Sequence, residues 1–154
     1  MRTPPAPTQQ GALILLVDDN PHGLVARRTV LEELGYSIRT ATNGEEALHQ
    51  LSLHQVDLVI TDFRMPNMDG VELISRIRKL RADMPVILLS GFVEPLGLTE
   101  QSTGADVVLS KSAGEVDSIL RSVRRLLTRQ PQRKPALSQQ ASAKKARNAG
   151  QAQS

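Results

Sequence analysis

Polar side chains that bind cations or react with phosphoryl groups follow four separate apolar runs of the sequence. Asp18 and Asp19 come directly after one run, Asp62 follows another, and Ser90 and Lys111 follow two more. If the first and third runs form neighbouring strands, the three carboxylates converge and repel one another, so they need a cation. Oxygen ligands with room for water suit Mg²⁺, which binds through one or two carboxylates and keeps several waters.

The same residue types suit phosphoryl transfer. A carboxylate beside Mg²⁺ is a nucleophile that can attack a phosphoryl group and form an aspartyl phosphate. Such a reaction depends on positioning and charge neutralisation, so it also needs a further cation and a hydrogen-bond donor for the phosphoryl oxygens. Lys111 and Ser90 are of these types, and each lies at the end of its own apolar run.

The apolar runs predict the strands that position these residues. Most of the runs are continuous rather than alternating, which is typical of strands buried on both faces of a parallel sheet. The more alternating run at 37–41 predicts an edge strand. The expected strands span residues 13–17, 37–41, 57–60, 86–89 and 107–109.

Segments with helical periodicity lie between the strands, and each carries one apolar stripe. Asn20 and Pro21 predict the N-cap and first turn of the first helix, and Gly35 predicts its end. The stretch 92–104 is interrupted by proline and glycine and predicts at most a short helix. The alternation predicts an α/β fold with helices on both faces of an open parallel sheet, whose site lies at the carboxyl ends of the strands.

Length and charge predict one domain with two tails. The chain has 154 residues, enough for one globular domain, which we expect at 11–127. The leader at 1–10 and the tail at 128–154 carry too few apolar residues to form a core, so we expect both to be disordered. The tail holds six basic residues and no acidic one, so it accounts for the basic net charge of +3.

Several classes of protein are excluded by composition. The chain has no cysteine, which excludes disulfides, thiolate catalysis and cysteine-bound metals. The first residues lack the apolar segment of a signal peptide, and no apolar run is long enough to span a bilayer. We therefore expect a cytoplasmic protein without a membrane span.

Four sequence motifs resemble, in order and approximate spacing, the receiver domain of two-component response regulators. They are VDDNP at 17–21, TDFRMPNMDG at 61–70, LLSG at 88–91 and GADVVLSK at 104–111. The string D-x-x-M-P-x-M-D-G is very specific, and the resemblance covers about 11–127. It implies a flavodoxin-like α/β fold with a five-stranded parallel sheet in the order 2-1-3-4-5.

The resemblance also implies how the acidic residues act. Asp62 would be the phosphorylated aspartate, in a reaction that requires Mg²⁺. Asp19 would bind the metal directly and Asp18 mainly through water, while Asp62 and the backbone carbonyl of Arg64 would complete the ligands that the protein supplies. The phosphoryl group would come from a sensor histidine kinase or a histidine phosphotransfer protein.

The resemblance also implies switch and modulating residues, and some of these positions depart from the family pattern. Ser90 would be the switch hydroxyl and Lys111 the phosphoryl-binding lysine. Val108 stands where the family usually has the aromatic residue that reports the movement of the switch hydroxyl. Phe92 and Arg64 would flank the path of the hydrolytic water. Ser112 replaces the usual proline after the lysine, so we expect a trans peptide bond there.

The expected function is signalling, not enzymatic turnover of a separate substrate. A stand-alone receiver of the chemotaxis type would act by phosphorylation-dependent binding of an unknown downstream protein, or by phosphorelay, without specific DNA binding. One alternative is an aspartyl-phosphate hydrolase of the haloacid dehalogenase type, which needs a second acid where Arg64 stands. Another is a binder of nucleic acid or anionic surfaces that acts through the basic tail, although no aromatic residue follows Phe92 to stack on a base.

Overall fold

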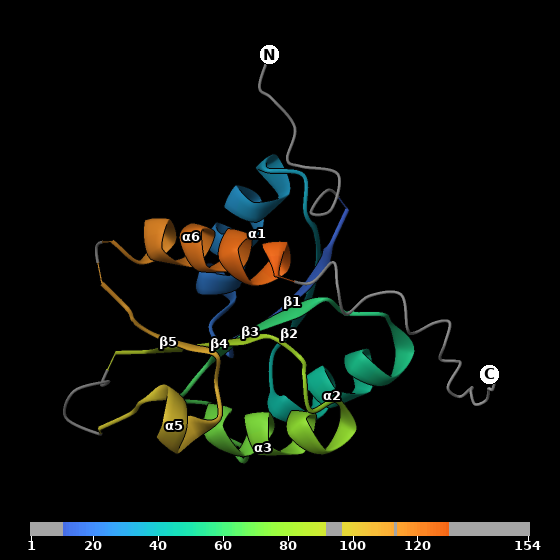
Figure 1. Ribbon diagram of the computed structural model, residues 1–154, viewed down its shortest axis with the longest axis vertical. Helices are drawn as coiled ribbons and strands as arrows, with labels where there is room; N and C mark the ends of the chain where they lie inside the picture. Colours follow the sequence, from blue (N-terminus) through green and yellow to red (C-terminus); the bar gives the residue numbers. More distant parts are fainter. Residues whose placement is uncertain (1–10, 92–96, 113, 130–154) are drawn as a thin grey trace. The chain divides into compact units, whose positions relative to one another are not determined.

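Five parallel strands form one sheet with helices on both of its faces (Figure 1). The computed structural model describes residues 11–91, 97–112 and 114–129. Within them the strands pair in the order β2-β1-β3-β4-β5, which confirms the predicted flavodoxin-like α/β fold. The strands are β1 (Leu13–Val17), β2 (Ser37–Ala41), β3 (Leu58–Asp62), β4 (Val86–Ser90) and β5 (Val107–Ser110).

The helices lie in two layers. Those described are α1 (Pro21–Glu33), α2 (Gly44–Leu53), α3 (Gly70–Leu80), α5 (Glu100–Thr103) and α6 (Glu115–Thr128). Helix α1 and the first part of α6 cover one face of the sheet, while α2, α3 and α5 cover the other (Figure 1). The chain divides into two units after Arg124, and the described part of the second unit is the end of α6 and Arg129.

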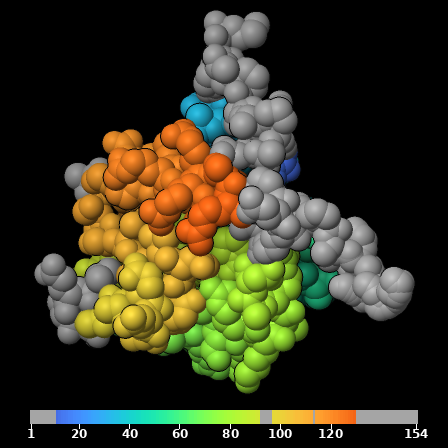
Figure 2. Space-filling model, in the orientation of Figure 1, coloured from blue at the N-terminus to red at the C-terminus, as the bar shows by residue number. Residues whose placement is uncertain are grey.

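The central strands form the core, as the continuous apolar runs predict. Every residue of β3 and β4 is buried, whereas the edge strand β2 alternates between exposed and more buried positions. On one face, α3 places Leu73, Ile74 and Ile77 in the core. Neighbouring α3 and α5 form a continuous surface in Figure 2, and Arg78 of α3 donates to the carbonyl oxygen of Gly104 at 2.8 Å. The close packing of the buried strands against α3 holds the strand ends in fixed positions.

A side-chain cap starts α1 where the sequence predicts. Asn20 accepts a hydrogen bond from the His22 N–H at 2.9 Å, and Pro21 opens α1. Gly35 follows the end of α1 with φ of 98°, a left-handed conformation that glycine adopts without strain. These local signals set the direction in which the chain leaves β1, and hence the placement of α1 beside the site.

Some element boundaries differ from the predicted ones. The third strand begins after Asp57 and continues to Asp62. Asp57 itself bonds to Leu13 in both directions: its side chain accepts from the Leu13 N–H, and its own N–H donates to the Leu13 carbonyl oxygen, each at 2.8 Å. The interrupted stretch contains the four-residue helix α5, in agreement with the expected short helix. The Lys111–Ser112 bond is trans, as predicted. The expected leader at 1–10 and nearly all of the tail at 128–154 lie outside the described residues.

Gly70 opens α3 at a point where no side chain fits beside the end of β3. A Cβ at Gly70 would lie 2.5 Å from the backbone oxygen of Asp62 and 2.7 Å from Leu88 Cδ1. We predict that Gly70→Ala lowers the free energy of unfolding by about 1–3 kcal/mol, because backbone must move to relieve the overlap. Urea denaturation measures the loss. Gly91→Ala is the matched control, since nothing lies within 4 Å of its added Cβ, and an equal effect of both variants would contradict the prediction.

Candidate functional site

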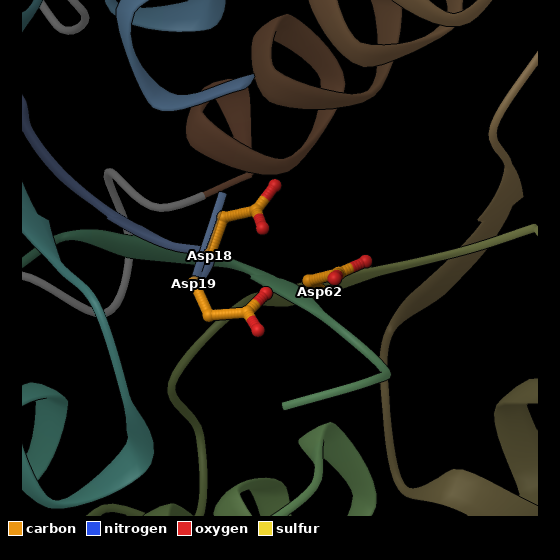
Figure 3. A group of neighbouring side chains, drawn as sticks. All are labelled: Asp18, Asp19 and Asp62. Atoms are coloured by element: carbon orange, nitrogen blue, oxygen red, sulfur yellow. The ribbon is translucent and has the colours of Figure 1, made fainter. Parts of the chain in front are cut away.

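Three carboxylates meet at the carboxyl end of the sheet. Asp62 is the last residue of β3, and Asp18 follows β1, whose Val17 pairs with Thr61. Asp18, Asp19 and Asp62 each offer an oxygen, and these oxygens all lie within 4.8 Å of one another (Figure 3). Asp18 and Asp62 are buried, with exposed fractions of 1% and 5%, whereas Asp19 is exposed. The predicted convergence of these residues is therefore present.

Lys111 brings a positive charge to this cluster. Its Nζ lies 2.6 Å from Asp62 Oδ1 and 4.0 Å from Asp18 Oδ2. Its backbone N–H donates to the carbonyl oxygen of Ser90 at 3.0 Å, which fixes the end of β5 beside the end of β4. The lysine is thus anchored at its backbone and directed at the buried carboxylate.

The other predicted site residues fall at or near the same edge. Ser90 ends β4 and is buried, one residue beyond Leu89, which pairs with Asp62. Arg64 is exposed in the loop that follows β3, and Asn67 in that loop has a φ of 72°. Asparagine tolerates this left-handed conformation better than most residues. The loop therefore turns back within a few residues of Asp62.

Of the two predicted modulating residues, the structure describes Val108. Val108 is partly buried against the core, and its backbone N–H donates to Glu100 Oε2 of α5 at 2.9 Å. The side chain that replaces the usual aromatic residue is thus held in the sheet by packing and through its own backbone. Phe92 lies outside the described residues.

Arg27 is a site residue that the sequence reasoning missed. From α1 its Nη1 contacts Asp18 Oδ2 at 2.8 Å, and its Nε contacts Glu115 Oε2, in the first turn of α6, at 2.7 Å. A signal was present, because Arg27 lies three residues after Leu24 and four before Leu31, on the apolar face of the helix. Glu115 carried no comparable signal.

Burial and charge act in opposite directions on the ionisable groups of the site. Burial raises the pKa of the Asp62 carboxyl, the hydrogen bond from Lys111 lowers it, and the charge of Asp18 raises it again, so that the net shift is upward. For Arg27, burial lowers the pKa, but hydrogen bonds to Glu115 and Asp18 and the negative charges of these two residues raise it, so that the net shift is upward. Arg27 is therefore a permanent positive charge in the site.

The donor set fits Mg²⁺. All the converging ligands are carboxylate oxygens, and one of them, on Asp19, faces solvent, so a cation there could keep some of its waters. The arrangement therefore combines an oxygen-rich cation site, a buried carboxylate that carries a raised pKa and a lysine in contact with it.

Comparison with known proteins identifies the class to which this fold and site belong. Residues 14–124 match the family model described as the response regulator receiver domain. The chain belongs to this family, whose members are phosphoacceptor signalling modules and not enzymes that turn over a separate substrate.

Individual relatives agree with this assignment. The response regulator protein TrrA of Thermotoga maritima, whose crystal structure is a complex with Mg²⁺ and BeF, is 36% identical, with a TM-score of 0.68 over 75% of this chain and 98% of that one. The probable transcriptional regulator ycf27 of Cyanidium caldarium is 39% identical over 79% of this chain and 50% of its own length. The sensor histidine kinase RcsC of Escherichia coli K12 is 45% identical over 49% of this chain and 8% of its own length.

The chain spans half or less of the length of these two curated relatives. None of the described helices combines the length and the apolar content that a membrane span requires. The position two residues beyond Asp62, where the hydrolase alternative needs an acid, is an exposed arginine. The tail on which the nucleic-acid alternative depends lies outside the described residues.

The raised pKa of Asp62 leads to a prediction about stability and pH. A carboxyl whose pKa is higher in the folded than in the unfolded state destabilises the fold when ionised, and this cost disappears as pH falls through the folded pKa. We therefore expect Asp62→Asn to raise the free energy of unfolding at pH 7 without Mg²⁺, with a smaller gain near pH 4. Urea denaturation in a chelating buffer at both pH values measures the difference.

Asp19→Asn is the control for this experiment, because it removes a charge from the same cluster at an exposed position. Its effect at pH 7 should be smaller, since no burial is relieved. A less stable Asp62→Asn at pH 7 would show that the ion pair with Lys111 outweighs the cost of burial.

Proposed function

We propose that the chain is a response regulator receiver that accepts a phosphoryl group on Asp62 from a sensor histidine kinase or a histidine phosphotransfer protein. The observation that carries the proposal is the contact of Lys111 Nζ with Asp62 Oδ1 at 2.6 Å inside the cluster of three carboxylates. Membership of the receiver family supports it, as does the Mg²⁺ and BeF complex of the relative TrrA.

In the proposed reaction, an oxygen of Asp62 attacks the phosphorus of a phosphohistidine. The new P–O bond forms as the P–N bond breaks, and the histidine nitrogen leaves with the electron pair. Lys111 then pairs with an oxygen of the transferred group, and the Ser90 hydroxyl donates to another. Transfer is favoured because the Lys111 ammonium and the Ser90 hydroxyl lie where negative charge accumulates.

Mg²⁺ would supply charge neutralisation for the phosphoryl oxygens and the acidic cluster. We propose Asp19, Asp62 and the backbone carbonyl of Arg64 as its ligands, with Asp18 contributing through water. The buried position of Asp18 and its contact with Arg27 support an indirect role, because one of its oxygens already has a charged partner.

The output would be phosphorylation-dependent binding of a downstream protein, or onward transfer of the phosphoryl group. The relatives include a protein named as a sensor histidine kinase and one named as a probable transcriptional regulator, and their full activities belong to chains at least twice as long as the matched segment. We place the exchange in the cytoplasm, without specific binding of DNA by this chain.

Phosphorylation at Asp62 is directly testable. Incubation with acetyl phosphate and Mg²⁺ should add one acid-stable, base-labile phosphoryl group, detected as a mass increase of the intact protein. Asp62→Asn should abolish it, because the nucleophile is gone. Asp69→Asn is the matched control, since Asp69 is exposed and caps α3, a role that asparagine also performs.

Uptake by Asp62→Asn equal to that of the wild type would contradict the assignment. Rapid turnover of assorted phosphate monoesters would instead favour the hydrolase alternative.

Lys111→Met should fold, because the lysine side chain is 31% exposed. Its phosphorylation should be slowed by roughly tenfold or more, because the positive charge that faces the phosphoryl oxygens is lost.

The lifetime of the phosphoryl group provides a second test. Hydrolysis needs a water in line with the leaving carboxylate. Arg64 stays protonated and cannot act as a base, and a phenylalanine at position 92 has no group to orient water. We expect slow decay in Mg²⁺ after the donor is removed, and faster decay when Arg64→Asn is combined with Phe92→Glu. Equal decay of the two proteins would show that these side chains do not control access of water.

A further inference from the structure

Arg27 bridges the acidic cluster and the first turn of α6. Its side chain is 10% exposed, and the two carboxylates that it contacts, Asp18 and Glu115, are 2% and 17% exposed. The three side chains come from the end of β1, from α1 and from α6, so the bridge links three separate elements. A largely buried arginine with two carboxylate partners holds a defined geometry, because the guanidinium presents its donors in a rigid fork.

The local sequence leaves room for this bridge. Gly23 lies one helical turn before Arg27, and a Cβ at that position would lie 2.9 Å from Asp18 Oδ2 and 3.1 Å from Arg27 Nη1. Both of these atoms take part in the ion pair. The absence of a side chain at Gly23 therefore lets the guanidinium reach the carboxylate.

Both oxygens of Asp18 are engaged within the protein. Oδ1 accepts from the Asn20 N–H at 2.9 Å, while Oδ2 contacts Arg27 at 2.8 Å and lies 4.0 Å from Lys111 Nζ. A cation that enters the cluster meets a positive charge already placed on one of its carboxylates. The bridge therefore opposes the entry of a second cation.

Arg27 reduces the negative charge of the site but does not cancel it. The cluster and the bridge together contain two positive side chains and four negative ones; the positive ones are Arg27 and Lys111, and the negative ones are Asp18, Asp19, Asp62 and Glu115. A divalent cation balances the difference. Glu115 draws the Arg27 charge toward α6, so it reduces the share of that charge available to Asp18.

We propose that Arg27 is a built-in counter-cation that competes with Mg²⁺ for Asp18 and, through Glu115, couples the metal content of the site to the first turn of α6. The proposal rests on the proposed function, because it takes the acidic cluster as the Mg²⁺ site. Arg27 acts through Asp18, so it is a positioning residue for the metal and not one of its ligands.

The test is Mg²⁺ affinity, measured by isothermal titration calorimetry on the full chain. Arg27→Met should bind Mg²⁺ roughly three- to tenfold more tightly, because a competing charge is removed. Glu115→Gln should bind it roughly two- to fivefold more weakly, because Arg27 then interacts with Asp18 alone. A purely structural role would weaken binding in both variants, so opposite signs would exclude a purely structural role.

A double-mutant cycle tests the coupling to α6. If Glu115 acts through Arg27, Glu115→Gln should lose most of its effect on Mg²⁺ affinity in the Arg27→Met background. Full additivity of the two changes would show that each acts independently through long-range charge, and would overturn the coupling.

Matched controls come from a second ion pair on the same helix. Arg28 pairs with Glu32 at 3.0 Å, and both side chains are about half exposed. Arg28→Met and Glu32→Gln make the same changes of charge outside the cluster and should leave Mg²⁺ affinity within about twofold of the wild type, because exposed charges are screened.

Further variants keep the test valid if Arg27→Met does not fold. Gly23→Ala retains every charge but crowds both Asp18 Oδ2 and the guanidinium, so it should lengthen the ion pair and tighten Mg²⁺ binding by a smaller factor. Arg27→Lys keeps the charge and should shift the affinity least. Unchanged or weaker binding in both Gly23→Ala and Arg27→Met would overturn the competition, whereas absence of Mg²⁺ binding by the wild type would overturn the proposed function as well.

Discussion

Mutual repulsion among three carboxylates is the constraint on which the rest of this molecule depends. Asp18, Asp19 and Asp62 bring oxygens within 4.8 Å of one another at the end of a buried sheet. Such a cluster is stable only where positive charge is supplied. Lys111 supplies it from β5 and Arg27 from α1, each in contact with one buried carboxylate. The elements around the sheet are therefore arranged to neutralise charge as well as to bury apolar surface.

The parts of the fold that follow from local pattern were predictable from the sequence. The continuous apolar runs gave the strands, and the cap at Asn20 gave the start of the first helix. The site residues were found because they directly follow strands, and parallel strands end at the same edge of a sheet. Asp62 and Lys111 are far apart in the chain, yet their contact follows from this topology.

Other features depend on contacts that no local pattern encodes. The position of Arg27 on the apolar face of its helix shows that it is buried, but not that Asp18 and Glu115 are its partners. The Glu115 contact requires α1 and α6 to share one face of the sheet, and that follows only from the complete topology. The boundary at Asp57 similarly involves tertiary contacts, because its carboxylate and its backbone N–H both bond to Leu13.

The hydrogen bond between Glu100 and the Val108 N–H has a consequence for the solubility of the domain. β5 is the last strand of the sheet, so its outer edge presents backbone groups that could pair with a strand of another molecule. Glu100 occupies one of these donors and places a carboxylate over the edge. A charge on a four-residue helix thus blocks one pairing position and disfavours the approach of another strand at this edge.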